Sequence, residues 1–184
     1  MFKSVTTTLG EKTDKSSLLE WRKRVGDAEA DKISNQAATR GTAVHELCEK
    51  YIMNDENYSF GAMPSNLDSF MKIKRVLDSR ITKIFGIEYP LFSHTLRAAG
   101  RTDVIAEFDG VNSIVDFKTS RKVKLEEYIT NYFLQATCYA MMAEELTGMV
   151  IPKIAIIIAV DHEPTQVFVK DKSEYVERVK EIFC

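Results

Sequence analysis

The sequence predicts a single α/β domain in which helices flank a mixed β-sheet. Three observations favour this class. Helical periodicity dominates the first third of the chain, two alternating runs meet at Asp109-Gly110, and an apolar run over 154–160 follows a long helical segment. Helices and strands then alternate, which is typical of α/β domains. A chain of 184 residues, of which 45% are hydrophobic, is long enough to bury one substantial core.

The N-terminal part is predicted to be helical. A short helix capped by Asp14 or Ser16 ends at Gly26, and a second helical pattern runs from 27 to about 53. This second pattern permits a break at Gly41, because glycine weakens a helix interior. Its apolar stripe consists of Ile33, Ala37, Val44, Leu47, Cys48 and Tyr51.

The remaining elements follow a loop over 54–65. A helix capped by Ser65 is expected to run through Phe85 and to end at Gly86. A later long helix is expected to stop at Gly148. After Gly86, the sequence predicts strands over 87–94, 96–108 and 111–119, a helix over 123–147, a buried strand over 153–160, an edge strand over 165–170 and a helix from Ser173.

The composition argues against several classes of protein. The longest apolar run is too short to cross a bilayer, and the first residues lack the apolar core of a signal peptide. We therefore expect a cytoplasmic protein with no membrane partner. The three cysteines lie far apart and form no CxxC pair, which favours neither a zinc site nor a disulfide framework. With a net charge of −2, any nucleic-acid contact must come from a local basic groove.

The predicted hairpin gathers charged side chains on one face of the sheet. If Asp109-Gly110 is the whole turn, Asp103 faces Asp116 across the two strands, with Cβ atoms roughly 4.5–5.5 Å apart. Two bare carboxylates at about 5 Å repel by roughly 3 kcal/mol, which a bound cation would relieve. Lys118 shares this face, two residues further on. A longer turn would keep the face but shift the pairing. The alternative is a set of solvated charges on an edge hairpin.

Four more polar side chains could join this face. His45 lies at the border of its helix's apolar stripe, from which it could reach a neighbouring sheet. Glu88 precedes the hairpin on its own strand, and Gln135 and Tyr139 share one helical face at i, i+4 spacing. Each also has a structural interpretation: a half-buried histidine, a surface glutamate, and routine packing of a helix on a sheet.

Taken in order, five segments resemble the motif series of RecB-like nucleases, a branch of the PD-(D/E)XK superfamily: GTAVHELCEKY, EYP, GRTDVIAEF, IVDFKTS and QATCY. The resemblance runs from about residue 40 to 139 and is strongest to small phage exonucleases and the mitochondrial genome maintenance exonuclease. It implies a restriction-endonuclease-like core, with a central mixed sheet, flanking helices and extra N-terminal helices. Within one domain over 1–184, residues 1–64 would form the helical part carrying His45, and 65–184 the catalytic sheet core.

The resemblance also implies a metal-dependent DNA exonuclease. The implied metal ligands are His45, Asp103, Asp116 and the backbone carbonyl of Phe117. Lys118 would be the catalytic lysine, acting with Asp103 and Asp116, and Glu88 would be an accessory catalytic carboxylate. Oxygen ligands suit Mg²⁺, and an added imidazole also favours Mn²⁺, so one or two such ions are expected. Relatives with an iron–sulfur cluster use four cysteines, and Cys48, Cys138 and Cys184 do not fit that spacing. No cluster is therefore expected.

DNA, either single-stranded or at ends, is the implied partner, together with a helicase, recombinase or other replication protein. Gln135 and Tyr139 match a motif that holds the site and the DNA backbone. Trp21 and Tyr132 could stack on bases. The basic residues that flank the motifs are Arg22, Lys23, Arg24, Arg40, Arg121, Lys122 and Lys124.

Two alternatives to an exonuclease of DNA replication, repair or recombination stay open. One is a structure-specific or restriction-like endonuclease on the same fold. The other is an inactive nuclease-fold module that binds only DNA or a protein. The presence of Asp103, Asp116 and Lys118 together argues against an inactive module, which would not need all three.

Overall fold

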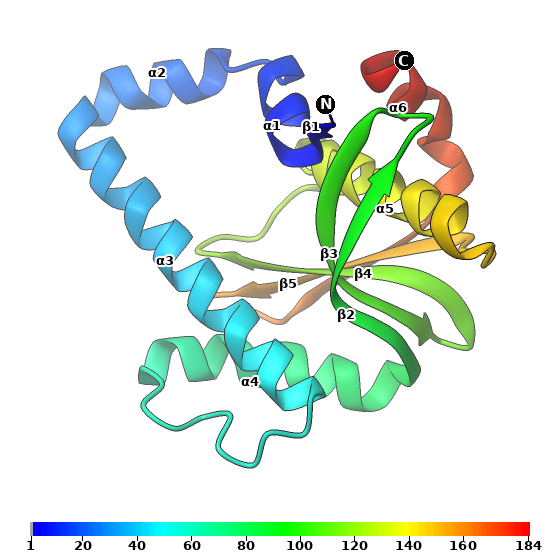
Figure 1. Cartoon of the computed structure of the whole chain (residues 1–184). Helices are drawn as coiled ribbons and strands as arrows, with labels where there is room; N and C mark the ends of the chain where they lie inside the picture. Colours follow the sequence, from blue (N-terminus) through cyan, green and yellow to red (C-terminus); the bar gives the residue numbers. More distant parts are fainter. Residues whose placement is uncertain (1) are drawn as a thin grey trace.

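The fold is seen in a computed structural model that describes residues 2–184, and it is built on a six-stranded mixed sheet (Figure 1). The strands are β1 (Lys3–Ser4), β2 (Ile81–Ser93), β3 (Ala98–Phe108), β4 (Val111–Ser120), β5 (Lys153–Val160) and β6 (Gln166–Asp171). The helices are α1 (Val5–Lys12), α2 (Ser16–Val25), α3 (Asp27–Ile52), α4 (Pro64–Arg80), α5 (Thr130–Thr147) and α6 (Val176–Phe183), with short 3₁₀ turns η1 (Glu126–Tyr128) and η2 (Lys172–Glu174).

The sheet has the order β1-β3-β4-β5-β6, with β2 paired to the second edge of β3. The β1–β3 and β4–β5 pairs are parallel, and the other pairs are antiparallel. Helices lie on both sides of the sheet and extra helices precede it, so the predicted fold class is confirmed (Figure 1). Across residues 2–184, none of the helices combines the length and apolarity needed to cross a bilayer.

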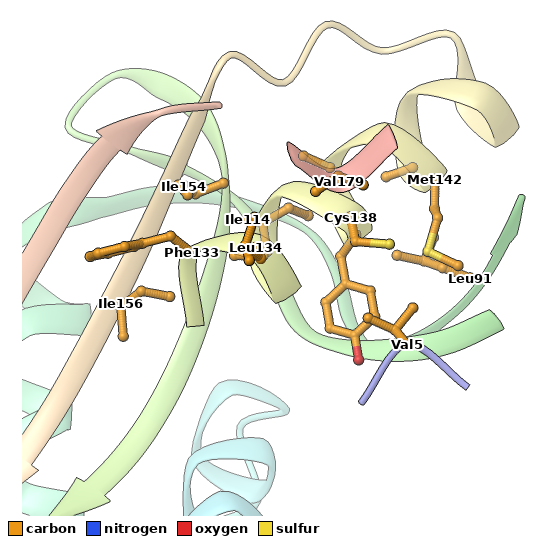
Figure 2. Close-up of a cluster of buried hydrophobic side chains, with 14 of the residues drawn as sticks. Val5, Leu91, Ile114, Phe133, Leu134, Cys138, Met142, Ile154, Ile156 and Val179 are labelled. Atoms are coloured by element: carbon orange, nitrogen blue, oxygen red, sulfur yellow. The ribbon is translucent and has the colours of Figure 1, made fainter. Parts of the chain in front are cut away.

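Two hydrophobic clusters cover the two faces of the sheet. On one face, α5 packs with α1 and α6 against alternate residues of β4 and β5; Figure 2 shows Phe133 and Leu134 beside Ile114, Ile154 and Ile156. On the other face, the second half of α3 and α4 cover the intervening strand residues, Val115 and Phe117 among them. Because β5 is buried on both faces, its continuous apolar sequence is explained, and the strand predicted over 153–160 is confirmed.

The sheet opens between β3 and β4. Strand β2 follows one edge of β3 along its whole length, from Ala98 to Phe108. On the opposite edge, β4 pairs with β3 only from Val104 to Phe108, and β1 pairs with Ala98 and Ala99. Since a strand has only two edges, residues 100–103 face no strand of the described chain on the β4 side. This opening is where the charged side chains of the hairpin lie.

The Asp109-Gly110 turn is confirmed, with Ile105 opposite Ile114 and Val104 opposite Val115 as its two-residue length predicts. Asp109 and Gly110 both adopt positive φ, as such turns require. Helix α2 ends at Gly26 and α5 at a left-handed Gly148, both as predicted. Strand β6 lies at an edge of the sheet, also as predicted.

The helix predicted over 65–85 is too long. Helix α4 ends at Arg80, and the next five residues begin β2, so Gly86 lies within a strand. Ile81 pairs with Phe108, and the backbone ladder with β3 overrides the local helical pattern. The cap was also assigned wrongly, because Met63 is the N-cap and Pro64 opens the first turn, where its missing N–H costs nothing.

The helix predicted over 123–147 begins seven residues late, at Thr130. A reciprocal pair of hydrogen bonds explains the difference: the Lys124 N–H donates to Gln166 Oε1 at 2.8 Å, and Gln166 Nε2 donates to the Lys124 carbonyl at 2.9 Å. These bonds tie the segment to β6 in an irregular form. The C-terminal helix is likewise divided, with η2 before α6.

Helix α3 runs through Gly41 without a break. Its second half buries Val44, Leu47 and Cys48, whereas Ala37 is exposed, so the predicted stripe holds only for that half. The first half extends with α2 away from the sheet (Figure 1). The N-cap of α2 is Lys15 rather than Asp14 or Ser16, although the Asp14 carboxylate accepts the Ser16 N–H at 2.9 Å. The short elements β1 and α1 were not predicted.

Candidate active site

Asp103 lies where β3 and β4 separate. The last antiparallel pair is Val104–Val115. Beyond this pair, the Asp103 side chain, rather than a backbone carbonyl of β3, binds the backbone of β4. Its Oδ2 accepts the backbone N–H of Phe117 at 2.8 Å. Asp103 alternates with Val104 and Asp116 alternates with Val115, so both carboxylates belong to the α5 side of the sheet. The predicted common face is therefore observed, while a direct backbone pairing of the two aspartates is not.

His45 reaches this opening from α3. Its Nε2 lies 2.7 Å from the Phe117 carbonyl oxygen, and its Nδ1 lies 3.3 Å from Asp103 Oδ1. Phe117 thus contacts both side chains through its backbone, with its N–H on Asp103 and its carbonyl on His45. The helix, β3 and β4 meet at this one peptide unit.

Glu88 completes a compact ligand cluster from β2. It lies between Ile87, which pairs with Val104, and Tyr89, which pairs with Thr102, so it stands opposite Asp103. Its φ is +45°, a left-handed conformation that costs about 1–3 kcal/mol and that collects at functional sites. One ligand atom each of His45, Glu88 and Asp103 lies within 4.8 Å of the others.

Asp116 and Lys118 form an ion pair beside this cluster. Lys118 Nζ lies 2.6 Å from Asp116 Oδ2, and the two side chains are 21% and 4% exposed. The approach lacks the alignment of a hydrogen bond, so the buried Oδ2 atom has charge compensation but no hydrogen-bond partner. The ammonium also lies over the Tyr132 ring, 5.1 Å from the ring centre.

Burial and neighbouring charges perturb every titratable group of the site. Burial favours neutral His45, but the contact with Asp103 outweighs it and raises the pKa of His45 to about 9. Burial would raise the pKa of Asp103, yet the His45 contact lowers it overall. The pKa of Asp116 is raised, chiefly by burial, and Lys118 only partly compensates. Burial also raises the pKa of Glu88, to which the Asp103 charge adds. For Glu88 and Asp116, burial and like charge therefore outweigh the effect of the neighbouring cations on the pKa.

These residues fit a divalent cation. Three carboxylates and an imidazole are ligand types that Mn²⁺ accepts, and Mg²⁺ accepts the oxygens. Asp116 Oδ2 is buried without a hydrogen-bond partner, and the raised pKa of Asp116 and of Glu88 means that the neighbouring cations do not offset the burial and mutual repulsion of these carboxylates. His45, Glu88 and Asp103 could hold the ion, with Asp116 and the Phe117 carbonyl adjacent.

Gln135 and Tyr139 contact one another on α5, with Gln135 Nε2 donating to the Tyr139 hydroxyl at 3.3 Å. The buried Tyr139 ring lies directly over Gly100 of β3, where an added Cβ would come within 2.6 Å of ring atom Cε1. Glycine is therefore required here for the close approach of helix and strand. The GRTD and QATCY segments therefore pack against each other through Gly100 and Tyr139. The sequence positions of the two segments did not predict this contact.

The basic residues predicted to bind DNA are dispersed. Arg40 is held by Asp161 and donates to Ser69 Oγ at 2.7 Å, so its guanidinium is engaged away from the His45 cluster. Arg121 Nη2 contacts Gln36 Oε1 at 3.2 Å, at the rim of an open cavity of about 880 Å³ between α3 and the end of β4. Lys122 is exposed beside it.

Arg22 joins α2 to α3 through ion pairs with Asp27 and Asp31. Sequence reasoning missed Arg101, a 65% exposed side chain whose Nη1 lies 3.6 Å from Glu88 Oε2. Its position beside Asp103 in the GRTD segment was the available signal.

The sequence matches no family model and no curated protein. Among solved structures, the fold is similar to that of a proposed exonuclease from Eubacterium rectale, with a TM-score of 0.51 and 14% identity. That match covers 77% of this chain and 64% of the other, so this chain spans less than two thirds of that protein's length. A second structure, of SSO0001, is similar over 76% of this chain and 71% of its own, at 16% identity and a TM-score of 0.37. The first likeness supports the α/β fold, with a mixed central sheet flanked by helices.

Proposed function

We propose that this protein is a metal-dependent DNA exonuclease that hydrolyses phosphodiester bonds in DNA replication, repair or recombination. The observation that carries the proposal is the convergence of His45, Glu88 and Asp103 beside the buried Asp116–Lys118 pair, at the opening between β3 and β4. Carboxylates that surround a cation position, with an amine next to them, suit hydrolysis of a phosphodiester. The likeness to a proposed exonuclease supports the fold on which this chemistry is built.

The residues of the site would have two roles, metal binding and stabilisation of charge. His45, Glu88, Asp103 and Asp116, with the Phe117 carbonyl, would hold Mg²⁺ or Mn²⁺. When bound, the ion would supply Lewis-acid chemistry by polarising a phosphodiester oxygen. Lys118 keeps a fixed positive charge at the site, where it can orient the attacking water or stabilise the charge that develops on the phosphate.

DNA is the proposed substrate, and a strand entering the site would pass exposed cations. Arg101 lies next to the ligand cluster, and Arg121 and Lys122 lie beyond the end of β4. These side chains supply the local positive charge that the overall net charge of −2 does not. A helicase, recombinase or other replication protein is the proposed partner, since strand separation would require another enzyme.

End-labelled DNA tests the proposal. Single- and double-stranded substrates would be incubated with Mg²⁺, Mn²⁺ or EDTA, beside Lys118→Ala and Asp116→Ala. We expect ladders that start at one end with the divalent ions, no products with EDTA, and no products from either variant, because each removes a charge from the reacting centre. Cleavage of circular DNA would favour the endonuclease alternative. DNA binding without cleavage under every condition would favour the inactive module.

A further inference from the structure

The amine of Lys118 has two close neighbours. Asp116 Oδ2 lies 2.6 Å from Nζ, and Nζ lies over the Tyr132 ring, 5.1 Å from the ring centre. Only 21% of the lysine side chain is exposed. The ring therefore faces a cation that is largely removed from water, which is the setting in which a cation–π contact is strongest.

Tyr132 is partly buried, and it packs against the hydrophobic cluster on the α5 side of the sheet. It lies in the first turn of α5, where its backbone N–H donates to the carbonyl of the buried Ile129 at 2.8 Å. Within residues 2–184, no hydrogen bond forms to its hydroxyl, so the ring face is what it offers to Lys118. The neighbouring Phe133 anchors the same turn in the hydrophobic cluster on the α5 side of the sheet.

Asp116 has two competing roles. It neutralises Lys118, and it also belongs to the group of carboxylates that would hold a divalent cation. A carboxylate drawn to a divalent ion binds an ammonium less tightly, because its charge is then shared. The long lysine side chain would be free to change rotamer unless another group restrained it. Of these two contacts of the Lys118 amine, the one with the Tyr132 ring does not depend on Asp116.

We propose that Tyr132 is a positioning residue that keeps Lys118 Nζ at the reacting centre through its ring face. This inference rests on the proposed nuclease function for its consequence in catalysis, but the contact itself can be tested without any metal or DNA. Its chemistry differs from the base stacking that the sequence suggested for Tyr132. It predicts that an aromatic ring, rather than a hydroxyl, is required at position 132.

The first test measures the reactivity of Lys118 in metal-free protein. Reductive methylation with formaldehyde and a borane, followed by peptide mass spectrometry, gives the labelling rate of each lysine. We expect Tyr132→Leu to label Lys118 several-fold faster than the wild type, and Tyr132→Phe to label it at the wild-type rate. Tyr128→Leu is the matched control, because Tyr128 is 75% exposed on the neighbouring turn and should leave the rate unchanged.

The second test measures DNA cleavage by the same variants. Tyr132→Leu should lower kcat about tenfold, equivalent to about 1.4 kcal/mol and within the range of a desolvated cation–π contact, with KM unchanged. Tyr132→Phe should keep kcat within about twofold of the wild type, since it keeps the ring. If Tyr132→Leu melts well below the wild type, Tyr132→Met provides a flexible apolar side chain without a π face for both measurements.

The outcomes separate this inference from the proposed function. The inference would be overturned if Tyr132→Leu and Tyr132→Met both kept the wild-type labelling rate of Lys118 and the wild-type kcat. It would also be overturned if Tyr132→Phe changed the labelling rate and kcat as much as Tyr132→Leu does. If the wild-type protein cleaves no DNA, the proposed function fails and the labelling rates alone decide whether Tyr132 restrains Lys118.

Discussion

Phe117 acts in the candidate site through its backbone. Its ring is buried on the α3–α4 side of the sheet, while its N–H and its carbonyl contact Asp103 and His45. The ring also meets the His45 imidazole edge-on, with centroids 6.0 Å apart. A hydrophobic residue thus fixes the peptide unit on which two polar side chains depend. The packing of Phe117 on the α3–α4 side therefore helps to position the candidate ligands His45 and Asp103.

A substitution at Gly100 tests whether packing positions the residues of the candidate site. Gly100→Ala would place a methyl group 2.6 Å from Tyr139, so α5 or β3 must move. We expect a loss of about 1–3 kcal/mol in unfolding free energy and a marked loss of cleavage, because Tyr139 and Gln135 shift together. Urea denaturation and the DNA assay would measure both.

Gly10→Ala is the matched control, since no atom lies within 4 Å of the added Cβ and the residue is helical. That change should leave stability equal or slightly higher. A Gly100→Ala variant as stable and active as Gly10→Ala would show that the close approach to Tyr139 is not required.

At the scale of the elements, the sequence predicted what is encoded locally. Asp109-Gly110 requires positive φ at both turn residues, and that requirement fixes the register of β3 on β4. The buried β5 was predicted with its exact bounds because burial on both faces leaves a continuous apolar run. The boundary between α4 and β2 was not predictable, because Arg80 and Ile81 differ in state only through pairing with the distant Phe108.

The candidate site divides in the same way. The common face of Asp103, Asp116 and Lys118 follows from strand alternation, which is local. The contact of His45 with the Phe117 carbonyl and the seat of Tyr139 on Gly100 depend on how helices cross the sheet. The engagement of Arg40 by Asp161 was missed for the same reason, since 121 residues separate them in sequence.

Helix α3 contains Gly41 at a position where packing does not require glycine. No atom lies within 4 Å of an added Cβ, and the residue is one turn before His45 on the same helical face. Gly41→Ala should raise the unfolding free energy by about 0.5–1 kcal/mol, because alanine is the better helix former. We nonetheless expect the rate of DNA cleavage to fall, because the added methyl group would leave less space for the substrate beside His45. Unchanged cleavage would mean that the substrate does not pass over Gly41.

The Arg40–Asp161 pair joins α3 to the turn after β5 and gives a pH-dependent prediction. The bond from Arg40 lowers the pKa of Asp161, although burial opposes this. Asp161→Asn should therefore cost about 1–2 kcal/mol at neutral pH, where the carboxylate is charged. The pair's contribution is present above the ordinary aspartate pKa of about 4 and is lost as pH falls through the lowered folded-state pKa.

Denaturation curves of Asp161→Asn and the wild type at neutral and acid pH would measure this difference. Asp68→Asn is the control, because Asp68 is 69% exposed and its nearest Lys72 contact is 3.7 Å. It should cost less than about 0.5 kcal/mol. An Asp161→Asn penalty that persists unchanged in acid would exclude the ion pair as its cause.

At the scale of the whole molecule, the site exists because the sheet opens. Strands β3 and β4 separate at Asp103, β2 closes the other edge of β3 and supplies Glu88, and α3 crosses the opening with His45. Helix α3 and the consecutive strands β2, β3 and β4 therefore meet around carboxylates, two of which, Glu88 and Asp116, have a raised pKa. A structure assembled in this way should gain stability when a cation neutralises them, because the unfolded chain offers no such arrangement.

Thermal unfolding with divalent ions tests this last point. If Mn²⁺ binds the folded protein alone, a concentration 100 times its Kd adds about 2.7 kcal/mol of stability. For a chain of this size, that corresponds to a rise in Tm of about 5–10 °C. Asp103→Asn should abolish the rise, because it removes the carboxylate shared by β3, His45 and Phe117. The control is Asp109→Asn, a turn carboxylate paired with Arg80 outside the site, which should keep the full rise. A Tm that Mn²⁺ leaves unmoved in the wild type would show that the opening between β3 and β4 does not bind this ion.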